Sequence, residues 1–150
     1  MNDSLNLEPN WADSLLVITA YYGSKPARWI GQAKGSIEEG GICFLGDIAL
    51  ENEIVVPGGF LGMCKRKIQI RGNGFGKQLL DRFEQEMSKH GAGKIQGNLV
   101  PETADKLGWL IGWYRDLGYE FRPGETVGEW APPDTAGIVS KVLPTCTSID

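Results

Sequence analysis

Hydrophobic and polar residues follow a two-residue period through much of the first 50 residues. The run 15–22 is rich in β-branched and aromatic residues and predicts a strand. Residues 28–37 predict a second, weaker strand and residues 42–50 a third, and the turn-forming sequence at 38–41 separates them. The first third of the chain therefore predicts an antiparallel meander.

Regular alternation in the third strand assigns its residues to two faces. It puts Phe44, Ile48 and Leu50 on one face and Asp47 and Glu51 on the other. The two acids either line a cleft or face water.

Two segments beside this meander show a less clear period. The first ten residues are mostly polar, so we expect 1–14 to be a loose segment that precedes a single domain, 15–150. Residues 52–70 contain two short β-rich runs around Pro57-Gly58-Gly59. This stretch predicts an insertion or a long hairpin.

The hydrophobic period changes to 3.6 near residue 76. A helix is predicted over 76–90, with Leu79, Leu80, Phe83 and Met87 on its apolar stripe. The polar residues between them are predicted to face outward: Asp81, Arg82, Glu84, Gln85 and Lys89. Further along the chain the pattern predicts a strand, a second helix ended by Gly118, and two more strands: 94–100, 103–118, 119–122 and 137–143. The predicted order is β-β-β-α-β-α-β-β, a mixed α/β (α+β) fold.

Composition narrows the class of protein. Fifteen Lys and Arg against 19 Asp and Glu give a formal net charge of −4, which argues against a protein that holds nucleic acid by its phosphates. No apolar run reaches the roughly 18 residues of a membrane span, and the first residues do not resemble a signal peptide. Three cysteines without Cys-x-x-Cys spacing predict no zinc or other metal site and favour a reducing, cytoplasmic location. Glycine, at 21 of 150 residues, is about twice as frequent as usual.

Three of these glycines lie in Arg71-Gly72-Asn73-Gly74-Phe75-Gly76, between a β-like segment and the predicted helix 76–90. Free amides at a helix start, where the helix dipole is positive, suit a phosphate or pyrophosphate. A dinucleotide fingerprint fails because Lys77 replaces its third glycine. A Walker loop fails because Arg71 and Gln78 stand where it needs Gly and Ser or Thr. The alternative is that the glycines only form a turn.

Two motifs give the chain a family resemblance. Arg71-x-x-Gly74-x-Gly76, followed by a helix that contains Leu-Leu, resembles the Gln/Arg-x-x-Gly-x-Gly/Ala signature of the GNAT-family N-acetyltransferases. The block Trp113-Tyr114-Arg115-Asp116-Leu117-Gly118-Tyr119 resembles that family's Phe-Tyr-x-x-x-Gly-Phe. The two motifs stand in the family's order and spacing.

The resemblance implies a mixed, mostly antiparallel sheet that splays open beside the loop, with two main helices and acetyl-CoA in the gap. The family's first strand and two N-terminal helices are expected to be missing. Asn98 is the candidate substitute for an asparagine that the family often has where Leu107 stands, and the alternative is an ordinary asparagine at the end of a strand. The cofactor-binding residues are then Arg71, Gly72, Asn73, Gly74, Phe75, Gly76, Lys77 and Asn98.

The resemblance also implies roles in catalysis. Tyr114 falls at the position that commonly supplies the acid for the leaving thiolate. The alternative is that Tyr114 is only part of the apolar face of its helix. Asp47 and Glu51 are the candidate general bases, and for both the alternative is a solvated strand face. The acceptor site would be open, completed by 52–70, or completed by the second subunit of a homodimer.

The function these features favour is direct transfer of acetyl from acetyl-CoA to a small-molecule or peptide amine in a ternary complex. A non-catalytic acyl-CoA-sensing or partner-binding domain is the alternative. The third hypothesis is a structural module whose glycine loop binds nothing.

Overall fold

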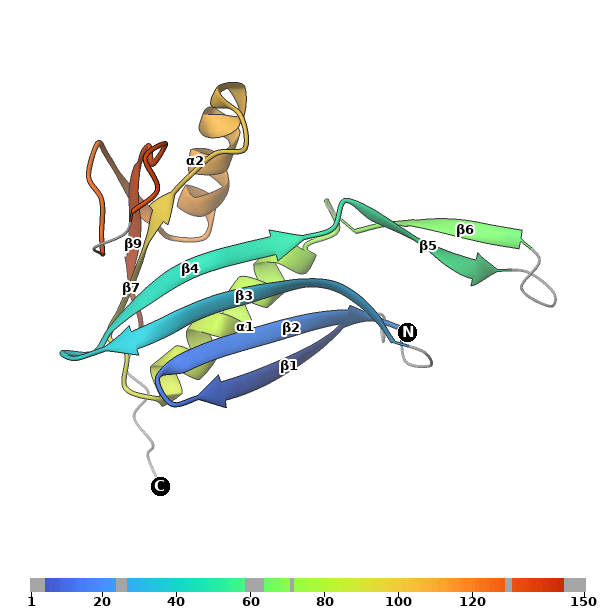
Figure 1. Cartoon of the computed structure of the whole chain (residues 1–150), viewed down its shortest axis with the longest axis horizontal. Helices are drawn as coiled ribbons and strands as arrows, with labels where there is room; N and C mark the ends of the chain where they lie inside the picture. The colour runs from blue at the N-terminus through green and yellow to red at the C-terminus, as the bar shows by residue number, and fades with distance from the viewer. Residues whose placement is uncertain (1–4, 24–26, 59–63, 71, 129–130, 145–150) are drawn as a thin grey trace.

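The computed structural model describes residues 5–23, 27–58, 64–70, 72–128 and 131–144. Two helices and one short 3₁₀ turn accompany a seven-stranded sheet and a separate two-stranded one (Figure 1). The elements in chain order are β1 (Leu5–Ala12), β2 (Leu15–Tyr22), β3 (Arg28–Glu38), β4 (Ile42–Leu50), β5 (Glu53–Gly58), β6 (Cys64–Gln69), α1 (Phe75–Lys89), β7 (Lys94–Leu99), η2 (Ala104–Lys106), α2 (Leu107–Asp116), β8 (Glu120–Pro123) and β9 (Gly137–Val142).

The larger sheet has the strand order β1-β2-β3-β4-β7-β9-β8. Every neighbouring pair is antiparallel except β4 and β7, which are parallel and are joined through α1. This is the mixed, mostly antiparallel sheet with two main helices that the sequence predicts, so the predicted fold class is confirmed.

The sheet opens between its two parallel strands. Only Ile42–Phe44 of β4 pair with Lys94–Gln96 of β7. Beyond this pairing, β4 continues to Leu50 and β7 to Leu99. Figure 1 shows the two strands diverging beyond the paired residues. Each strand therefore has a stretch without a neighbour on the side of the gap, which leaves backbone groups there for another partner.

The core lies between α1 and one face of the sheet. The predicted stripe of Leu79, Leu80, Phe83 and Met87 is fully buried, and the helix runs from Phe75 to Lys89 instead of 76–90. Leu16 and Ile18 of β2 are fully buried in the same cluster. Helix α1 and strand β3 lie very close to each other at Gly35. A Cβ added there would lie 2.5 Å from the Phe83 ring.

The prediction that 1–14 is loose is wrong for residues 5–12, which form β1 and pair along their whole length with β2. Leu5, Leu7 and Trp11 alternate with polar neighbours and pack partly buried against the core, a pattern that a half-buried strand needs. The chain thus has a strand before residue 15, where the resemblance led us to expect none. Only Asp13 and Ser14 join β1 to β2, and Asp13 has φ 55°, so no helix separates these two strands.

Within the segment 52–70, strands β5 and β6 pair antiparallel and extend beyond the large sheet, near the start of α1 (Figure 1). The predicted turn at Pro57-Gly58-Gly59 is misplaced, since Pro57 and Gly58 belong to β5 and pair with Lys65 and Cys64. The base of the hairpin is fixed by burial, with Ile54 2% and Ile70 0% exposed.

Candidate functional site

The glycine loop presents free amides at the start of α1. Gly72 has φ 87° and Gly74, the helix N-cap, has φ 78°, a backbone region that favours glycine. Among the described residues, none of the amides from Gly72 to Lys77 donates a hydrogen bond. A Cβ added at Gly72 or Gly74 would meet nothing within 4 Å. The loop therefore offers amide donors that have no acceptor among the described residues, at the positive end of a helix dipole and with no side chain on Gly72 or Gly74.

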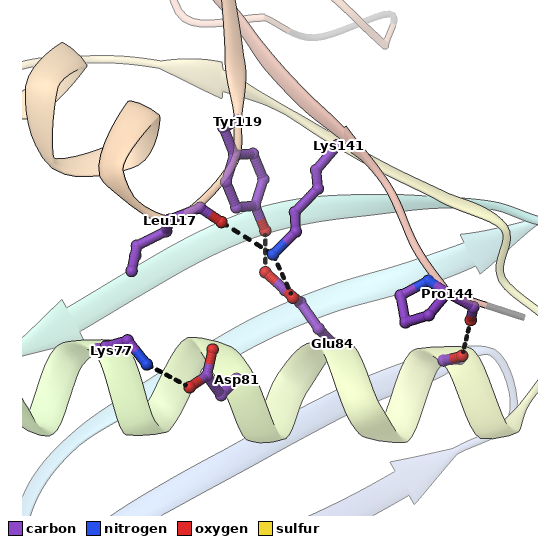
Figure 2. Close-up of polar contacts among 8 residues, drawn as sticks. Lys77, Asp81, Glu84, Leu117, Tyr119, Lys141 and Pro144 are labelled. Carbon is purple, nitrogen blue, oxygen red and sulfur yellow. Dashed lines mark hydrogen bonds and ion pairs between the residues drawn. The ribbon is translucent and has the colours of Figure 1, made fainter. Parts of the chain in front are cut away.

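The side chains of this loop are partly engaged. The Asn73 amide donates to the Gln69 carbonyl oxygen, which holds the loop against the end of β6. Lys77 Nζ lies 3.1 Å from Asp81 Oδ2, one helical turn on (Figure 2). Both partners of this pair are exposed, so it holds Lys77 only weakly. Arg71, the remaining candidate in the loop, lies outside the described residues.

Helix α2 approaches the loop through Trp113. A Cβ added at Gly76 would lie 3.2 Å from Cζ2 of the Trp113 ring. Gly76 therefore allows the indole of α2 to rest on the first turn of α1. The two helices that border the splayed strands meet at this contact.

A bulge in β4 changes the predicted faces of that strand. Gly35 pairs with Leu45 and Lys34 with Asp47, so Gly46 is an extra residue. The prediction that Phe44 shares a face with Ile48 and Leu50 is therefore wrong, because the extra residue reverses the alternation between them.

Tyr114 lies on α2 and is 6% exposed. Its ring makes edge contacts with Trp113 at 5.0 Å and with Tyr119 at 5.3 Å between centroids. Burial, and to a smaller extent the negative charge of Asp47, raise the pKa of Tyr114 to about 12. The Tyr114 hydroxyl makes no hydrogen bond to any described residue. Asp47 on β4 thus acts electrostatically on a protonated, unpartnered phenol on α2.

The other two candidates stand apart from this pair. Glu51 is exposed at the end of β4, where its backbone N–H donates to the Ile30 carbonyl oxygen. The side-chain amide of Asn98 donates to the Val127 carbonyl oxygen at 2.9 Å and accepts from the Val127 N–H at 2.8 Å. Asn98 therefore holds the loop before β9, and its role as a cofactor ligand stays a prediction.

The prediction that Glu84 faces outward from α1 is wrong. The residue is only 9% exposed, and its partners are Tyr119, which follows α2, and Lys141 of β9. A carboxylate that directly follows Phe83 in an apolar stripe was the available signal, since a charge at the edge of a buried face needs a partner.

Solved structures resemble the chain, whereas no protein-family model and no curated protein matches it. An acetyltransferase of the GNAT family from Staphylococcus aureus Mu50 aligns with a TM-score of 0.62 and 12% identity, over 87% of this chain and 69% of that one. The ribosomal-protein-S18-alanine N-acetyltransferase from Escherichia coli aligns with a TM-score of 0.56 and 14% identity, over 92% and 75%. The PaiA N-acetyltransferase from Thermoplasma acidophilum, in complex with coenzyme A, aligns with a TM-score of 0.56 and 16% identity, over 86% and 61%.

The chain therefore has the fold of the GNAT-family N-acetyltransferases. The strand order and the parallel pair β4–β7 are the features of the sheet that match this fold, and the sheet opens between these two strands. Neither helix in the described ranges is long and apolar enough to cross a membrane.

Proposed function

We propose that the protein is an acetyl-CoA-dependent N-acetyltransferase that binds its cofactor at residues 72–77 and in the adjoining gap between β4 and β7. The observation that carries the proposal is the set of amides at the start of α1 that donate to no described residue. These amides fit a diphosphate, because they are donors at the positive end of a helix dipole and no side chain of Gly72 or Gly74 covers them. Arg71 and Lys77 would add positive charge.

Acetyl-CoA would supply an activated thioester. Tyr114 would hold a proton on its hydroxyl for the leaving thiolate, since a pKa of about 12 keeps the phenol protonated at neutral pH. The Asp47 carboxylate, exposed on β4, would accept the proton of the incoming ammonium directly or through water. Glu51 is the second candidate for that base. Transfer then proceeds in one ternary complex, without a covalent enzyme intermediate.

The acceptor is proposed to be a small-molecule or peptide amine. The S18-alanine N-acetyltransferase, with the same fold, is named for a protein alanine acceptor. We place the reaction in the cytoplasm, because Cys43 is a free thiol in the described structure and a reducing compartment suits it.

A non-catalytic acyl-CoA-sensing domain is the second candidate. The observation that favours it is the two-residue connection between β1 and β2, where the resembled family has two helices beside the acceptor. A thiol-release assay over a panel of amines separates the two functions. The enzyme releases coenzyme A in the presence of at least one amine, whereas the sensor binds acetyl-CoA without releasing it.

Cofactor binding is tested by a charge placed on the loop. Asp and Asn both tolerate a positive φ and are nearly equal in size, so Gly74→Asp and Gly74→Asn differ mainly in charge. We expect Gly74→Asp to weaken acetyl-CoA binding at least about tenfold relative to Gly74→Asn, because the carboxylate repels the diphosphate. Calorimetric titration measures both affinities.

Gly40 supplies the matched control for this test. It has φ 85°, has nothing within 4 Å of an added Cβ, and lies in the turn between β3 and β4. Gly40→Asp should leave the affinity for acetyl-CoA unchanged. Equal affinities for Gly74→Asp and Gly74→Asn, or no binding by the parent protein, would overturn the proposed function.

A further inference from the structure

A buried polar cluster joins α1 and β9 to the segment that follows α2 (Figure 2). Glu84 of α1, Tyr119 after α2 and Lys141 of β9 form it, and we call it the Glu84 cluster. Tyr119 Oη donates to Glu84 Oε2 at 2.7 Å, and Lys141 Nζ donates to Glu84 Oε1 at 3.0 Å. Lys141 Nζ also donates to the Leu117 carbonyl oxygen at 2.8 Å. One carboxylate thus fixes the end of α2 and strand β9 to the middle of α1.

Tyr119 is tied in turn to Tyr114. Helix α2 ends in a Schellman motif, in which Gly118 has φ 95° and its N–H donates to the Arg115 carbonyl oxygen. The Tyr119 N–H donates to the Tyr114 carbonyl oxygen at 3.0 Å. The two rings are also in edge contact. A displacement of Tyr119 therefore displaces the backbone and the ring of Tyr114.

We propose that Glu84 is a positioning residue for acetyl transfer, which sets the place of Tyr114 relative to the cofactor loop through Tyr119 and Lys141. This inference rests on the proposed function. Glu84 and the loop amides belong to the same helix, α1, so a link from Glu84 to Tyr119 fixes α2 against the element that would hold the cofactor.

Burial fixes the positions of the Glu84 and Lys141 side chains relative to each other. The Glu84 side chain is 11% exposed and that of Lys141 25%, so both charges need their partners. Lys141 also lies over the Tyr119 ring, 5.5 Å from its centroid, and its side chain fills the space beside Gly118. In the resembled family motif, a phenylalanine stands at the position of Tyr119. Phenylalanine has no hydroxyl that could donate a hydrogen bond. The hydrogen bond to Glu84 is therefore a feature of this chain.

The test uses Tyr119→Phe, which removes one hydroxyl and keeps the ring, and Glu84→Gln. Misplacing a catalytic group by about 1 Å can cost about 100-fold, so we expect kcat to fall roughly 10- to 100-fold in both variants. The affinity for acetyl-CoA, measured by calorimetry, should change less than about twofold, since the loop amides keep their place.

Glu86→Gln is the matched control. Glu86 is also a nearly buried carboxylate of α1 with an aromatic donor and a cation as partners, Trp11 and Arg82, but it makes no hydrogen bond or ion pair with the residues of α2. This variant should lose stability and keep its kcat.

A second pair of variants separates positioning from stability. In a Tyr114→Phe background the added Tyr119→Phe should lower kcat no further, because the group that Tyr119 places is already gone. An additive loss would overturn the inference, as would an unchanged kcat in Tyr119→Phe and Glu84→Gln. A raised Kd for acetyl-CoA at constant kcat would also overturn it.

Hydrogen exchange keeps the inference separate from the proposed function. The amides of α2 should exchange faster in Tyr119→Phe and Glu84→Gln than in the parent, and not in Glu86→Gln. A protein with no acetyltransferase activity that shows this exchange pattern would overturn the proposed function and leave the link from Glu84 to α2 standing. Unchanged exchange of α2 would overturn the link to Glu84 whatever the activity.

Discussion

Tyr114 is kept in its protonated form by its surroundings. Its ring is nearly buried, and the nearby negative charge of Asp47 makes ionisation harder still. A group of this kind suits the donation of a proton to a leaving thiolate and does not suit the role of a base. The environment of the residue thus selects between the two directions of proton transfer.

The pH dependence of kcat tests this environment. An acid works only while protonated, so kcat should fall as the pH rises through the pKa of Tyr114, and the parent should show no such fall up to pH 10. Asp47→Asn removes the charge that contributes to the raised pKa, so the decline should move to lower pH. The position of the decline, and not the height of the profile, is compared. An unmoved decline would show that Asp47 does not act on Tyr114.

The burial of Cys43 predicts a low reactivity of its thiol. It is fully buried, and burial together with the charge of Glu84 raises the pKa of its thiol to about 12. In a Cys64→Ser, Cys146→Ser background the native protein should react with a thiol reagent at pH 8 many times more slowly than the protein unfolded in guanidinium. Comparable rates in the two states would contradict this burial. Because the pKa is raised, stability should be lost as the pH rises from about 9 towards 12.

Some residues of the candidate site can be identified from sequence and others cannot. The glycine loop is local, and its three glycines before a helical period suffice to predict free amides. Asn98 is different, because its partner Val127 comes from a loop 29 residues later. Glu84 is misassigned for a similar reason. Periodicity shows where a residue lies on its helix, but not which element covers that position.

At the scale of elements, β1 is attached to the far end of α1 by one small group of side chains. Trp11 stacks on His90 at 4.0 Å between ring centroids, and its Nε1 donates to Glu86 Oε1 at 3.5 Å. Arg82 and Lys89 place positive charge beside the same carboxylate. This contact orders an edge strand in which only Leu5, Leu7 and Trp11 are large apolar residues.

The pH dependence of stability tests this attachment. Burial would raise the pKa of Glu86, but the hydrogen bonds from Trp11 and Arg82 and the charge of Lys89 outweigh it and lower the pKa below 4.5. The ionised carboxylate therefore stabilises the fold above pH 4.5, and this contribution is lost as the pH falls through the lowered pKa. Glu86→Gln should be less stable by on the order of 1 kcal/mol at pH 7. Thermal melts should show this difference shrinking towards pH 3, and a constant difference would contradict the assignment.

Periodicity predicts the elements that bury a full face. The helix α1 and the strands β2 to β4 fall within one or two residues of their predicted bounds. It fails for β1, where Pro9 interrupts the alternation of Leu5, Leu7 and Trp11 with three polar residues. It also fails at Gly46, because a single inserted residue reverses every later face of β4 and the pattern of one strand cannot reveal which residue is unpaired.

At the scale of the molecule, the chain differs from the resembled family in two connections. The link between β1 and β2 is two residues long, and a hairpin lies between β4 and the cofactor loop. Arg28 Nη1 donates to the Val55 carbonyl oxygen at 3.1 Å, so the hairpin is attached to the start of β3 as well. The hairpin therefore lies beside the edge of the sheet that leads into the proposed site, where it can contribute a wall for the acceptor amine.

Shortening the hairpin tests that contribution. Val56 and Arg66 are paired across β5 and β6, so an Asn-Gly turn can replace residues 57–65 without breaking the remaining ladder. Ile54 and Ile70 keep their places in the core, and we expect Tm to change by only a few degrees. The Kd for acetyl-CoA should stay within about twofold, because the loop amides are untouched, whereas the KM for the amine should rise at least about fivefold. A shortened protein with an unchanged KM would show that the acceptor is bound without the hairpin, and a raised Kd for acetyl-CoA would show that the hairpin acts on the cofactor instead.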